Sequence, residues 1–345
     1  MATIFDLVTA KDLAVYWTQK NQNEQPFLGA TLFPRENVLG TELKWIKGSK
    51  NQPVGLRLSS YDAKAIRRDV QGIEEVSTKM PFFKESFYID EDLRQNLNNM
   101  IASNNQNVID KILGRIYDRE VSLIDSSEIT LERMRMELLT TGTITLSSNG
   151  QSYSYDYGLD DDQKQTVGTS WSNPEADIIG DITNYVDMMK AKGITITRAV
   201  CNSSVVKNFR NNTAMKNAIY VFAGGTVNIT DARAIDYIRE QTGISIAVYD
   251  NVYVDEGGES HKYIPDNTFV MLPDGDLGTT SLGTTPEESD LMNNLNAEVA
   301  IVNGGVAVTT SQIVDPVNVE TKVSMVGLPS FERANEIVIV DTVAA

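Results

Sequence analysis

A long helical pattern between residues 105 and 139 constrains the fold more than any other feature of the sequence. Apolar residues recur there at three- and four-residue spacing with charged residues between them, at Ile109, Leu113, Ile116, Leu123, Leu131, Met134 and Leu138. A helix of this length would be about 50 Å long. A coiled coil is the alternative, but the stripe carries Glu120 and Ser127 where a seam should be apolar. We therefore predict one long helix that lies against a sheet and ends near Gly142, which can supply a left-handed cap.

The segment before this helix, residues 42–88, is β-like at both ends and polar in the middle. TELKWIKG and VGLRLSS alternate apolar and polar residues, and the run MPFFKESFYI closes the segment. Between them, residues 62–72 are polar and basic and include Lys64, Arg67 and Arg68. These patterns predict a long hairpin with a basic tip. Such a hairpin cannot bury both faces against its own domain, so we expect it to pack on another body.

The first forty residues predict one amphipathic helix followed by an extended arm. Pro26 and Pro34 interrupt any helix beyond about Lys20. The apolar contacts of this region are expected from Phe5, Leu7, Val8, Leu13 and Val15.

The chain after residue 142 alternates β-like and helical patterns, which indicates an α+β or α/β domain. Asn149 and Gly150 suit the type I′ turn of a hairpin. Pro174 is expected to open one helix, and Ser203 or Ser204 to cap the next. The predicted helices are 175–192, 203–219 and 231–242, the predicted strands are 194–202 and 244–254, and three or four β-like runs finish the chain.

Composition narrows the chemistry that this chain can perform. The 47 acidic residues outnumber the 30 basic residues, and the net charge of −17 argues against a main task of gripping nucleic acid. The same charge is compatible with a protein that sits beside DNA without binding it. The one cysteine, Cys201, excludes an intrachain disulfide, and its apolar surroundings indicate a buried structural thiol. The one histidine, His261, leaves little room for histidine-dependent catalysis and is expected in a solvated turn.

Motifs for ligands are equally scarce. Neither GxxxxGK[ST] nor GxGxxG occurs. The acidic run from Asp160 to Asp162 and the pair Asp274 and Asp276 do not match the twelve-residue calcium loop, so solvated loops are expected there. We predict no catalytic residues, no cofactor and no metal, and hence no enzyme.

Three segments resemble the phage lambda major head protein family of tailed bacteriophages. The first is SIAVYDNVYVDEGGESHKYIPDNTFVM at residues 245–271, in which a strand and a glycine-containing turn lead into Pro-Asp-Asn-Thr and a second strand. The second is GTSWSNPEADIIGDI at residues 168–182, and the third is LGTTSLGTTPEESD at residues 277–290. The order of elements along nearly the whole chain also fits this family.

The resemblance implies an α+β chain with the Hong Kong 97-type phage capsid fold. Residues 1–40 would be the N-terminal arm and residues 41–88 an extended hairpin, the E-loop. Residues 89–150 would be the P-domain with its spine helix at about 105–139, and residues 151–310 the α/β A-domain. Residues 311–345 would return to the P-domain as strands.

The resemblance further implies a major capsid protein that self-assembles into hexamers and pentamers of an icosahedral shell around double-stranded DNA. A separate scaffold protein, a portal and a decoration protein are the partners it suggests. We expect Lys64, Arg67 and Arg68 to meet carboxylates of the next subunit, or otherwise to form a merely solvated turn. We also expect part of the negative charge to line the shell, so that packaged DNA slides.

Two rival functions remain open from the sequence. An encapsulin-type bacterial nanocompartment shares the fold, and purified shells without nucleic acid would favour it. A carboxylate-based glycosidase is more remote, because it needs a deep pocket with two suitably spaced acids. The sequence has no apolar run long enough to span a membrane and no secretory signal at its start, so a cytoplasmic protein is expected. The resemblance implies assembly in the host cytoplasm and a final place in the virion.

Overall fold

The computed structural model describes residues 8–23, 25–47, 64, 74–89, 91–102, 106–220, 228–291, 298–314 and 317–344. The chain divides into two compact units, each built from segments that are distant in the sequence. Unit 1 contains Met1–Lys44, Ser77–Glu132 and Thr279–Ser330, and unit 2 contains Trp45–Val76, Arg133–Gly278 and Phe331–Ala345.

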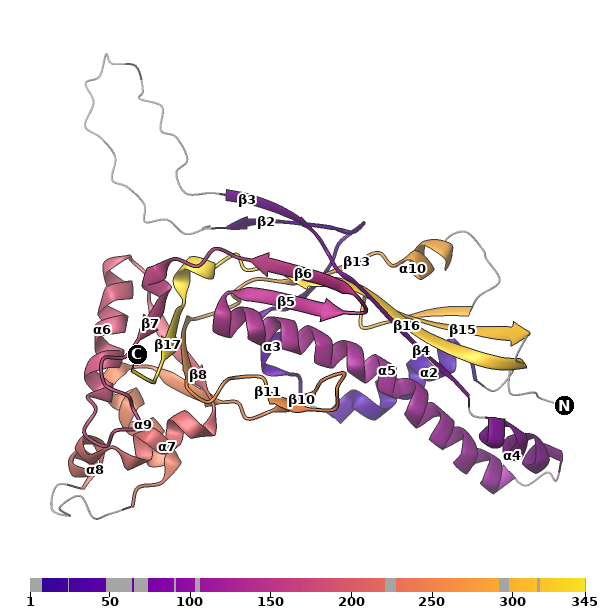
Figure 1. Cartoon of the computed structure of the whole chain (residues 1–345), viewed down its shortest axis with the longest axis horizontal. Helices are drawn as coiled ribbons and strands as arrows, with labels where there is room; N and C mark the ends of the chain where they lie inside the picture. The colour runs from indigo at the N-terminus through magenta and orange to yellow at the C-terminus, as the bar shows by residue number, and fades with distance from the viewer. Residues whose placement is uncertain are drawn as a thin grey trace. The chain divides into compact units, whose positions relative to one another are not determined.

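Unit 1 is a six-stranded sheet with helices (Figure 1). The strand order is β1-β13-β16-β15-β14, and β4 pairs with β16 on the edge opposite β15. All pairs are antiparallel except β1 with β13. The elements are α2 (Ala10–Lys20), η1 (Asn21–Asn23), α3 (Leu28–Leu32), β1 (Arg35–Asn37), β4 (Phe82–Tyr88), α4 (Glu91–Ala102), most of α5 (Gln106–Thr141), β13 (Thr280–Gly283), α10 (Pro286–Leu291), β14 (Glu298–Val302), β15 (Val306–Val314) and β16 (Val317–Pro329).

The long helix that the sequence predicts is α5, a single helix of 36 residues. Its apolar stripe is buried at Ile109, Ile116, Val121, Leu123, Ile124, Leu131, Met134, Leu138 and Leu139. Glu120 and Ser127 are buried within the same stripe, at 1% and 8% exposure. The Ser127 hydroxyl is satisfied within the helix, because it donates to the Ile124 carbonyl at 2.6 Å. The helix ends at Gly142, whose φ of +76° is the left-handed conformation expected of a glycine cap.

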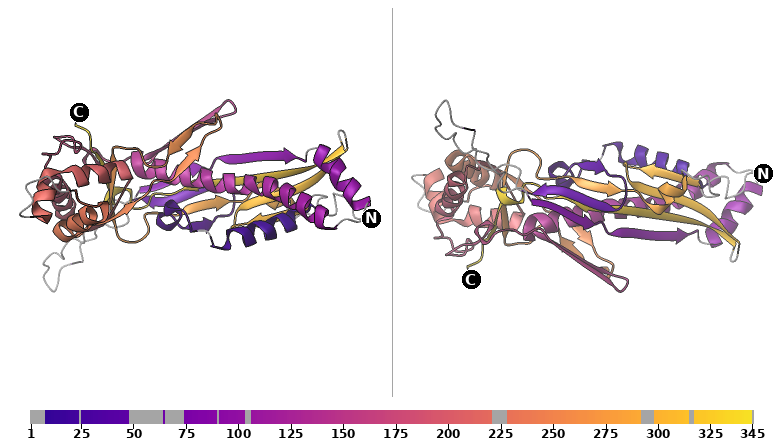
Figure 2. Two further views of the ribbon diagram at one scale, coloured as in Figure 1. Left: turned by 90° about the horizontal axis from the view of Figure 1, so that it is seen from below. Right: turned by 90° about the horizontal axis from the view of Figure 1, so that it is seen from above.

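The N-terminal helix α2 packs beside α5 in unit 1 (Figure 2). Thr9 caps it by accepting from the Asp12 amide. Trp17 is buried, and its Nε1 donates to Asp125 Oδ1 of α5 at 2.7 Å. The Asp118 carboxylate of α5 accepts from Tyr16 and Lys20 of α2, at 3.0 and 3.1 Å.

The predicted arm contacts are found only in part. Val8 and Leu13 are buried as expected, Val15 is 49% exposed, and Phe5 and Leu7 lie outside the described residues. The chain beyond Pro26 is not simply extended, because it forms α3 and then β1. Parallel pairing with β13 holds β1 in the sheet of unit 1.

The hairpin predicted over residues 42–88 is described at its base. β2 (Glu42–Lys47) and β3 (Glu74–Lys79) form a two-stranded sheet, and β4 then enters the six-stranded sheet. Among the described strands, β2 and β3 pair only with each other. Apart from Lys64, residues 48–73 lie outside the described part of the chain.

Unit 2 is built on a mixed five-stranded sheet of order β7-β17-β12-β8-β9. The pairs β7 with β17 and β8 with β9 are parallel, and the others are antiparallel. The elements of this unit, besides the end of α5 and parts of β2 and β3, are β5 (Thr143–Ser148), β6 (Gln151–Asp156), η2 (Asp161–Gln163), β7 (Lys164–Thr166), α6 (Ile178–Ala191), β8 (Ile196–Cys201), α7 (Ser203–Asn211), α8 (Thr213–Ile219), α9 (Asp231–Thr242), β9 (Ser245–Val248), β10 (Val252–Val254), β11 (Ser260–Lys262), β12 (Thr268–Pro273), η3 (Ala334–Glu336) and β17 (Val338–Asp341).

Two small hairpins complete unit 2. β5 and β6 turn at Asn149 and Gly150, both with positive φ, as the sequence predicts for a type I′ turn. β10 and β11 form the second hairpin, which carries His261.

Helices α6, α7 and α9 cover one face of the five-stranded sheet. The side chains of alternate strand residues, such as Phe269, Met271 and Val340, lie on this face and pack against the helices. Trp171 is at the centre of this core, with its ring 5.4 Å from Phe269 and 5.6 Å from Phe209 between centroids. Its Nε1 donates to Asp181 Oδ2 at 2.9 Å. The core is therefore an aromatic cluster whose one polar atom is satisfied.

Three helix starts differ from the prediction. α6 begins at Ile178 rather than residue 175, because the Asp177 carboxylate accepts from the Gly180 amide and caps it there. The cap of α7 is Asn202, whose Oδ1 accepts from the Ser204 and Val205 amides, and neither predicted serine is the cap. The helix predicted over 203–219 is two helices, because Asn212 ends α7 and its side chain caps α8.

The described part of 279–310, expected in the α/β domain, lies instead with unit 1. The reason is strand pairing, because β13 and β15 are hydrogen-bonded to β16 on its two edges. Long-range pairing of this kind leaves no local sequence signal.

We predict that Trp171→Ala will destabilise unit 2 by about 3–5 kcal/mol. The substitution leaves a cavity against Phe209 and Phe269 and removes the hydrogen-bond donor to the Asp181 carboxylate. Chemical denaturation followed by circular dichroism measures the change. Tyr153→Ala is the matched control, since Tyr153 is 45% exposed and its loss should change stability by less than about 0.5 kcal/mol. Equal effects of the two substitutions would contradict this account of the core.

Candidate assembly surfaces

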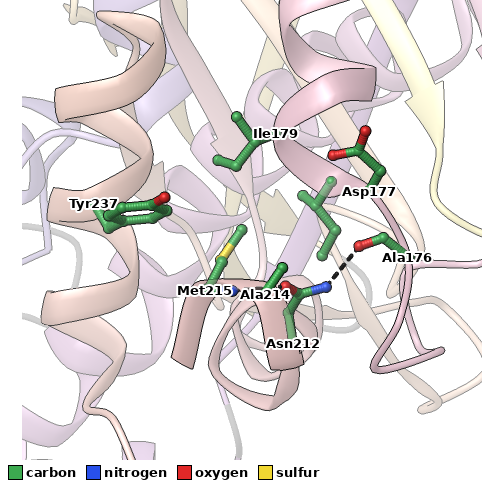
Figure 3. A pocket seen from close by; sticks show the side chains of 8 residues that line it. Ala176, Asp177, Ile179, Asn212, Ala214, Met215 and Tyr237 are labelled. Carbon is green, nitrogen blue, oxygen red and sulfur yellow. Dashed lines mark hydrogen bonds between the residues drawn. The ribbon is translucent and has the colours of Figure 1, made fainter. Parts of the chain in front are cut away.

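A small hollow of about 210 Å³ lies in unit 2 between the start of α6, α8 and α9 (Figure 3). Its polar groups already have structural roles. Asn212 Nδ2 donates to the Ala176 carbonyl at 2.7 Å, and its Oδ1 accepts from the Met215 amide at 3.0 Å. Of the eight residues that line the hollow, only Asp177 has a carboxylate, and that carboxylate caps α6. The hollow therefore does not supply the pair of acids that a glycosidase requires.

One cluster among the described residues has the donor types that hold a metal ion. The side-chain donor atoms of Asp255, Glu259 and His261 lie within 4.8 Å of one another at the end of the β10–β11 hairpin. Asp255 already uses both oxygens, because Oδ1 accepts from the Glu259 amide at 2.9 Å and Oδ2 is 2.8 Å from His261 Nε2. These hydrogen bonds lower the pKa of the Asp255 carboxyl, that from the Glu259 amide most. The arrangement closes the hairpin turn, and His261 lies in β11 rather than in the predicted solvated turn.

Cys201 is fully buried in the core of unit 2. Burial raises the pKa of its thiol to about 12, with a smaller contribution from Asp250. The thiol is therefore protonated at neutral pH and is not a nucleophile. This agrees with the structural role that the sequence predicts.

The predicted contact residues of the hairpin tip are described only at Lys64, which is exposed. Arg67 and Arg68 lie outside the described residues. Among the described residues, neither acidic loop belongs to a group of three side chains that could hold a metal ion. Asp162 forms an ion pair with Lys192 at 3.0 Å, and the carbonyls of Asp274 and Asp276 accept from Arg333.

Exposed apolar side chains mark surfaces that a partner could cover. Leu39, in the loop between β1 and β2, is 91% exposed, far more than any other large apolar residue of the described chain. Phe82 and Tyr88 at the two ends of β4 are 45% and 52% exposed. β4 is also an edge strand of the six-stranded sheet. Exposed large apolar side chains beside an edge strand are typical of interaction surfaces.

A polar clamp fixes the strand that precedes Leu39. Arg35 of β1 forms an ion pair with Glu128 of α5, and both side chains are mostly buried. Asn303, in the turn between β14 and β15, donates to the other oxygen of Glu128 at 2.9 Å. The backbone of Asn303 has a φ of +50°, and Gly304 follows with a φ of +74°. Glu128 thus joins α5, β1 and the β14–β15 turn, so the Leu39 loop leaves a rigid base.

A second carboxylate ties α10 to the opposite side of the sheet. Glu287 accepts from Lys322 at 2.8 Å and from the Ser324 hydroxyl at 2.7 Å, both on β16. Burial acts to raise the pKa of Glu287, but these hydrogen bonds outweigh it and the pKa lies below its ordinary value. The ionised pair therefore stabilises unit 1 at neutral pH.

The sequence profile of the family described as phage major capsid protein E matches residues 9–342. The chain belongs to the phage major capsid protein E family. It is a major capsid protein, a structural subunit of a phage shell. This finding confirms the resemblance to the phage lambda head family and decides between a phage head and an encapsulin. No curated protein sequence matches the chain.

Solved structures agree with the family at the level of the fold. A protein assigned as a prophage capsid protein from Escherichia coli CFT073 is similar, with a TM-score of 0.58 and 13% identity over 97% of this chain and 99% of the other. A phage-related protein from Bordetella bronchiseptica RB50 has the same TM-score and 11% identity, over 98% of each chain. The capsid protein has the α+β Hong Kong 97-type fold that the sequence predicts. Among its described residues, no helix combines the length and apolar character that crossing a bilayer requires.

The sequence reading missed the surface that stands out most in the structure. Leu39 lies in NVLGT, between two strands, next to Gly40 with a φ of +93°. An apolar residue beside a turn glycine is a weak signal, because such a leucine usually folds back onto its own domain. Only the three-dimensional position of the loop shows that this one does not.

We predict that Leu39→Asp will leave the fold of the capsid protein intact and reduce the yield of assembled particles several-fold, because it places a charge on an apolar group that we expect a neighbouring subunit to cover. Sedimentation of the expressed protein separates particles from free subunits. Thr41→Asp in the same loop is the matched control, since Thr41 is exposed and the change adds the same charge without removing the apolar contact. Normal assembly of the Leu39 variant would remove this loop from the assembly surfaces.

Proposed function

We propose that this capsid protein forms the hexamers and pentamers of an icosahedral shell that encloses double-stranded DNA. The family match over residues 9–342 is the observation that carries the proposal. The open hairpin β2–β3 and the exposed Leu39 support it, because both gain from contact with a neighbouring copy. In this role the chain is a structural protein without catalysis.

The proposal further assigns partners and a place of assembly. A shell of identical subunits needs a device that sets its curvature and a vertex through which DNA enters. A separate scaffold protein and a portal would supply these, a decoration protein could clamp the outside, and assembly would take place in the host cytoplasm.

Electron microscopy of the chain, expressed with and without the small genes that neighbour it, tests this function. Closed polyhedral particles, or capsomer rings without the neighbouring genes, would support it. DNA inside particles from an infected cell would support the proposal that the shell encloses double-stranded DNA. A monodisperse monomer under every condition would overturn the proposal.

The basic hairpin tip is our candidate for a contact between subunits. Lys64 is exposed, as a residue that meets a partner must be, and Arg67 and Arg68 follow it in the sequence. Because the chain carries a net charge of −17, a local group of three cations has many carboxylates to meet on a neighbouring copy. One exposed ion pair is worth about 0–1 kcal/mol, but a shell repeats the pair at every subunit and the pair helps to set register.

We predict that reversing all three charges, as Lys64→Glu, Arg67→Glu and Arg68→Glu together, will lower particle yield and make the remaining assembly less sensitive to salt. Light scattering at several ionic strengths gives both quantities. The matched control reverses three exposed lysines on other elements, Lys11, Lys164 and Lys207, and so changes the net charge equally. Unchanged assembly of the tip variant would leave the tip as a solvated turn.

Part of the net charge is proposed to line the inner surface, so that packaged DNA is repelled and slides. A polymer of phosphates binds where cations displace its counterions and slides where they are few. A charge map of the assembled shell is the test. A neutral or basic lining would reject this assignment.

A further inference from the structure

The interface between α5 and the sheet of unit 1 contains a buried carboxyl that no role described above uses. Glu120 is 1% exposed and lies within the apolar stripe of α5. Neither of its oxygens has a partner at hydrogen-bond geometry within the described residues. Burial of an acid without a strong partner disfavours its ionised form.

Thr321 of β16 is the polar group that faces Glu120. Its side chain is fully buried, and its hydroxyl likewise lacks a partner at hydrogen-bond geometry in the described chain. The hydroxyl lies near enough to stabilise the carboxylate slightly. The carboxyl and the hydroxyl therefore form an incompletely satisfied polar pair inside an otherwise apolar interface.

The register of the sheet shows which other side chains share the face of the sheet that carries Thr321. Thr321 lies opposite Thr310 of β15 and Phe87 of β4. Arg119, next to Glu120 on α5, lies with its guanidinium 5.2 Å from the centre of the Phe87 ring. Both threonines and Phe87 are neutral, so Arg119 is the cation that acts on Glu120.

The remaining charged groups are directed elsewhere. Glu85 of β4 is on the same face but exposed, and it lies opposite Val323. Asp118 of α5 is engaged by Lys20 and Tyr16 of α2. Lys322 is on the other face of the sheet, where it pairs with Glu287. No neighbour therefore offers Glu120 a direct ion pair within the described structure.

Burial raises the pKa of Glu120 from its usual value near 4.5 to about 7, and the Thr321 hydroxyl and Arg119 lower it by less. The folded chain thus holds the proton more tightly than the unfolded chain. Stability is then greatest in acid, falls as the pH rises through this range, and levels off above about 7.

We propose that Glu120 is a pH-sensitive latch between α5 and the β4–β16–β15 part of the sheet. The neutral carboxyl packs against Thr321 within the apolar stripe. The ionised carboxylate draws water into the interface and loosens α5 from the sheet. A shell built from many copies would therefore have walls that are stiffer in mildly acidic conditions than in mildly alkaline ones.

Hydrogen exchange of the full chain, compared at about pH 5.5 and about pH 8 after correction for the intrinsic exchange rate, tests the latch. We expect amides of α5 near Glu120 and of β16 near Thr321 to lose protection on the order of tenfold at the higher pH. Glu120→Gln should abolish that loss, because the amide keeps the shape of the carboxyl and cannot ionise. Glu85→Gln is the matched control on the same face and should retain the wild-type loss.

Infrared spectroscopy provides a second measurement that does not depend on stability. The wild-type protein at about pH 6 should show the carbonyl band of a protonated carboxyl, and Glu120→Gln should lack it. A wild-type pH profile identical to that of Glu120→Gln, or the absence of the band, would overturn the latch. Either result leaves the proposed shell function intact, because particle formation is scored separately by microscopy.

Discussion

Along its buried stripe, from Ile109 to Leu139, α5 places at least one apolar side chain in almost every turn against the core. Burial of each such side chain is worth roughly 1.5–3 kcal/mol, so this stripe is a major source of stability for the helix, since most helical stability in proteins comes from packing an apolar face. The strands that meet α5 in unit 1 come from both ends of the chain, and β1 and β16 are more than two hundred residues apart. Polar contacts from α5 then fix what surrounds it. Glu128 holds β1 and the β14–β15 turn, and Asp118 and Asp125 hold α2.

The contrast between the local pattern of α5 and the distant strands that it contacts explains which parts of the fold could be predicted. A stripe repeated over ten turns and an Asn-Gly turn are local signals, and α5 and the β5–β6 hairpin form where the sequence predicts them. The cap of α7 was predicted one or two residues too late, at Ser203 or Ser204, because Asn and Ser are both good caps. Tertiary hydrogen bonds decide between them, since Asn202 Nδ2 also donates to Ile264 O and Asp266 Oδ1. The two-unit division was not predictable, because it follows from strand pairs such as Arg35 with Thr280 that carry no local signal.

Surfaces were harder to predict than the core for a related reason. Sequence patterning identifies residues that avoid water, and it assigns all of them to the interior. Leu39 breaks that rule, and only the position of its loop reveals it. Glu120 is the opposite exception, because it is a charged type of residue that lies in the interior. As a polar residue in an apolar stripe it argued against a coiled coil, yet it is buried, and its environment rather than its position in the sequence determines its charge.

A capsid subunit must fold alone and still bind its copies, and the distribution of charge and exposure in this chain meets both needs. Copies that each carry a charge of −17 repel one another, which keeps free subunits apart and weakens every contact between them. Attraction must then come from apolar groups that the fold leaves outside, such as Leu39, Phe82 and Tyr88, and from the few cations placed to meet carboxylates. Weak contacts of this kind separate and reform, so wrongly placed subunits can leave before a shell closes. Strong contacts would trap errors, and an acidic surface with isolated apolar groups is a physical means of avoiding them.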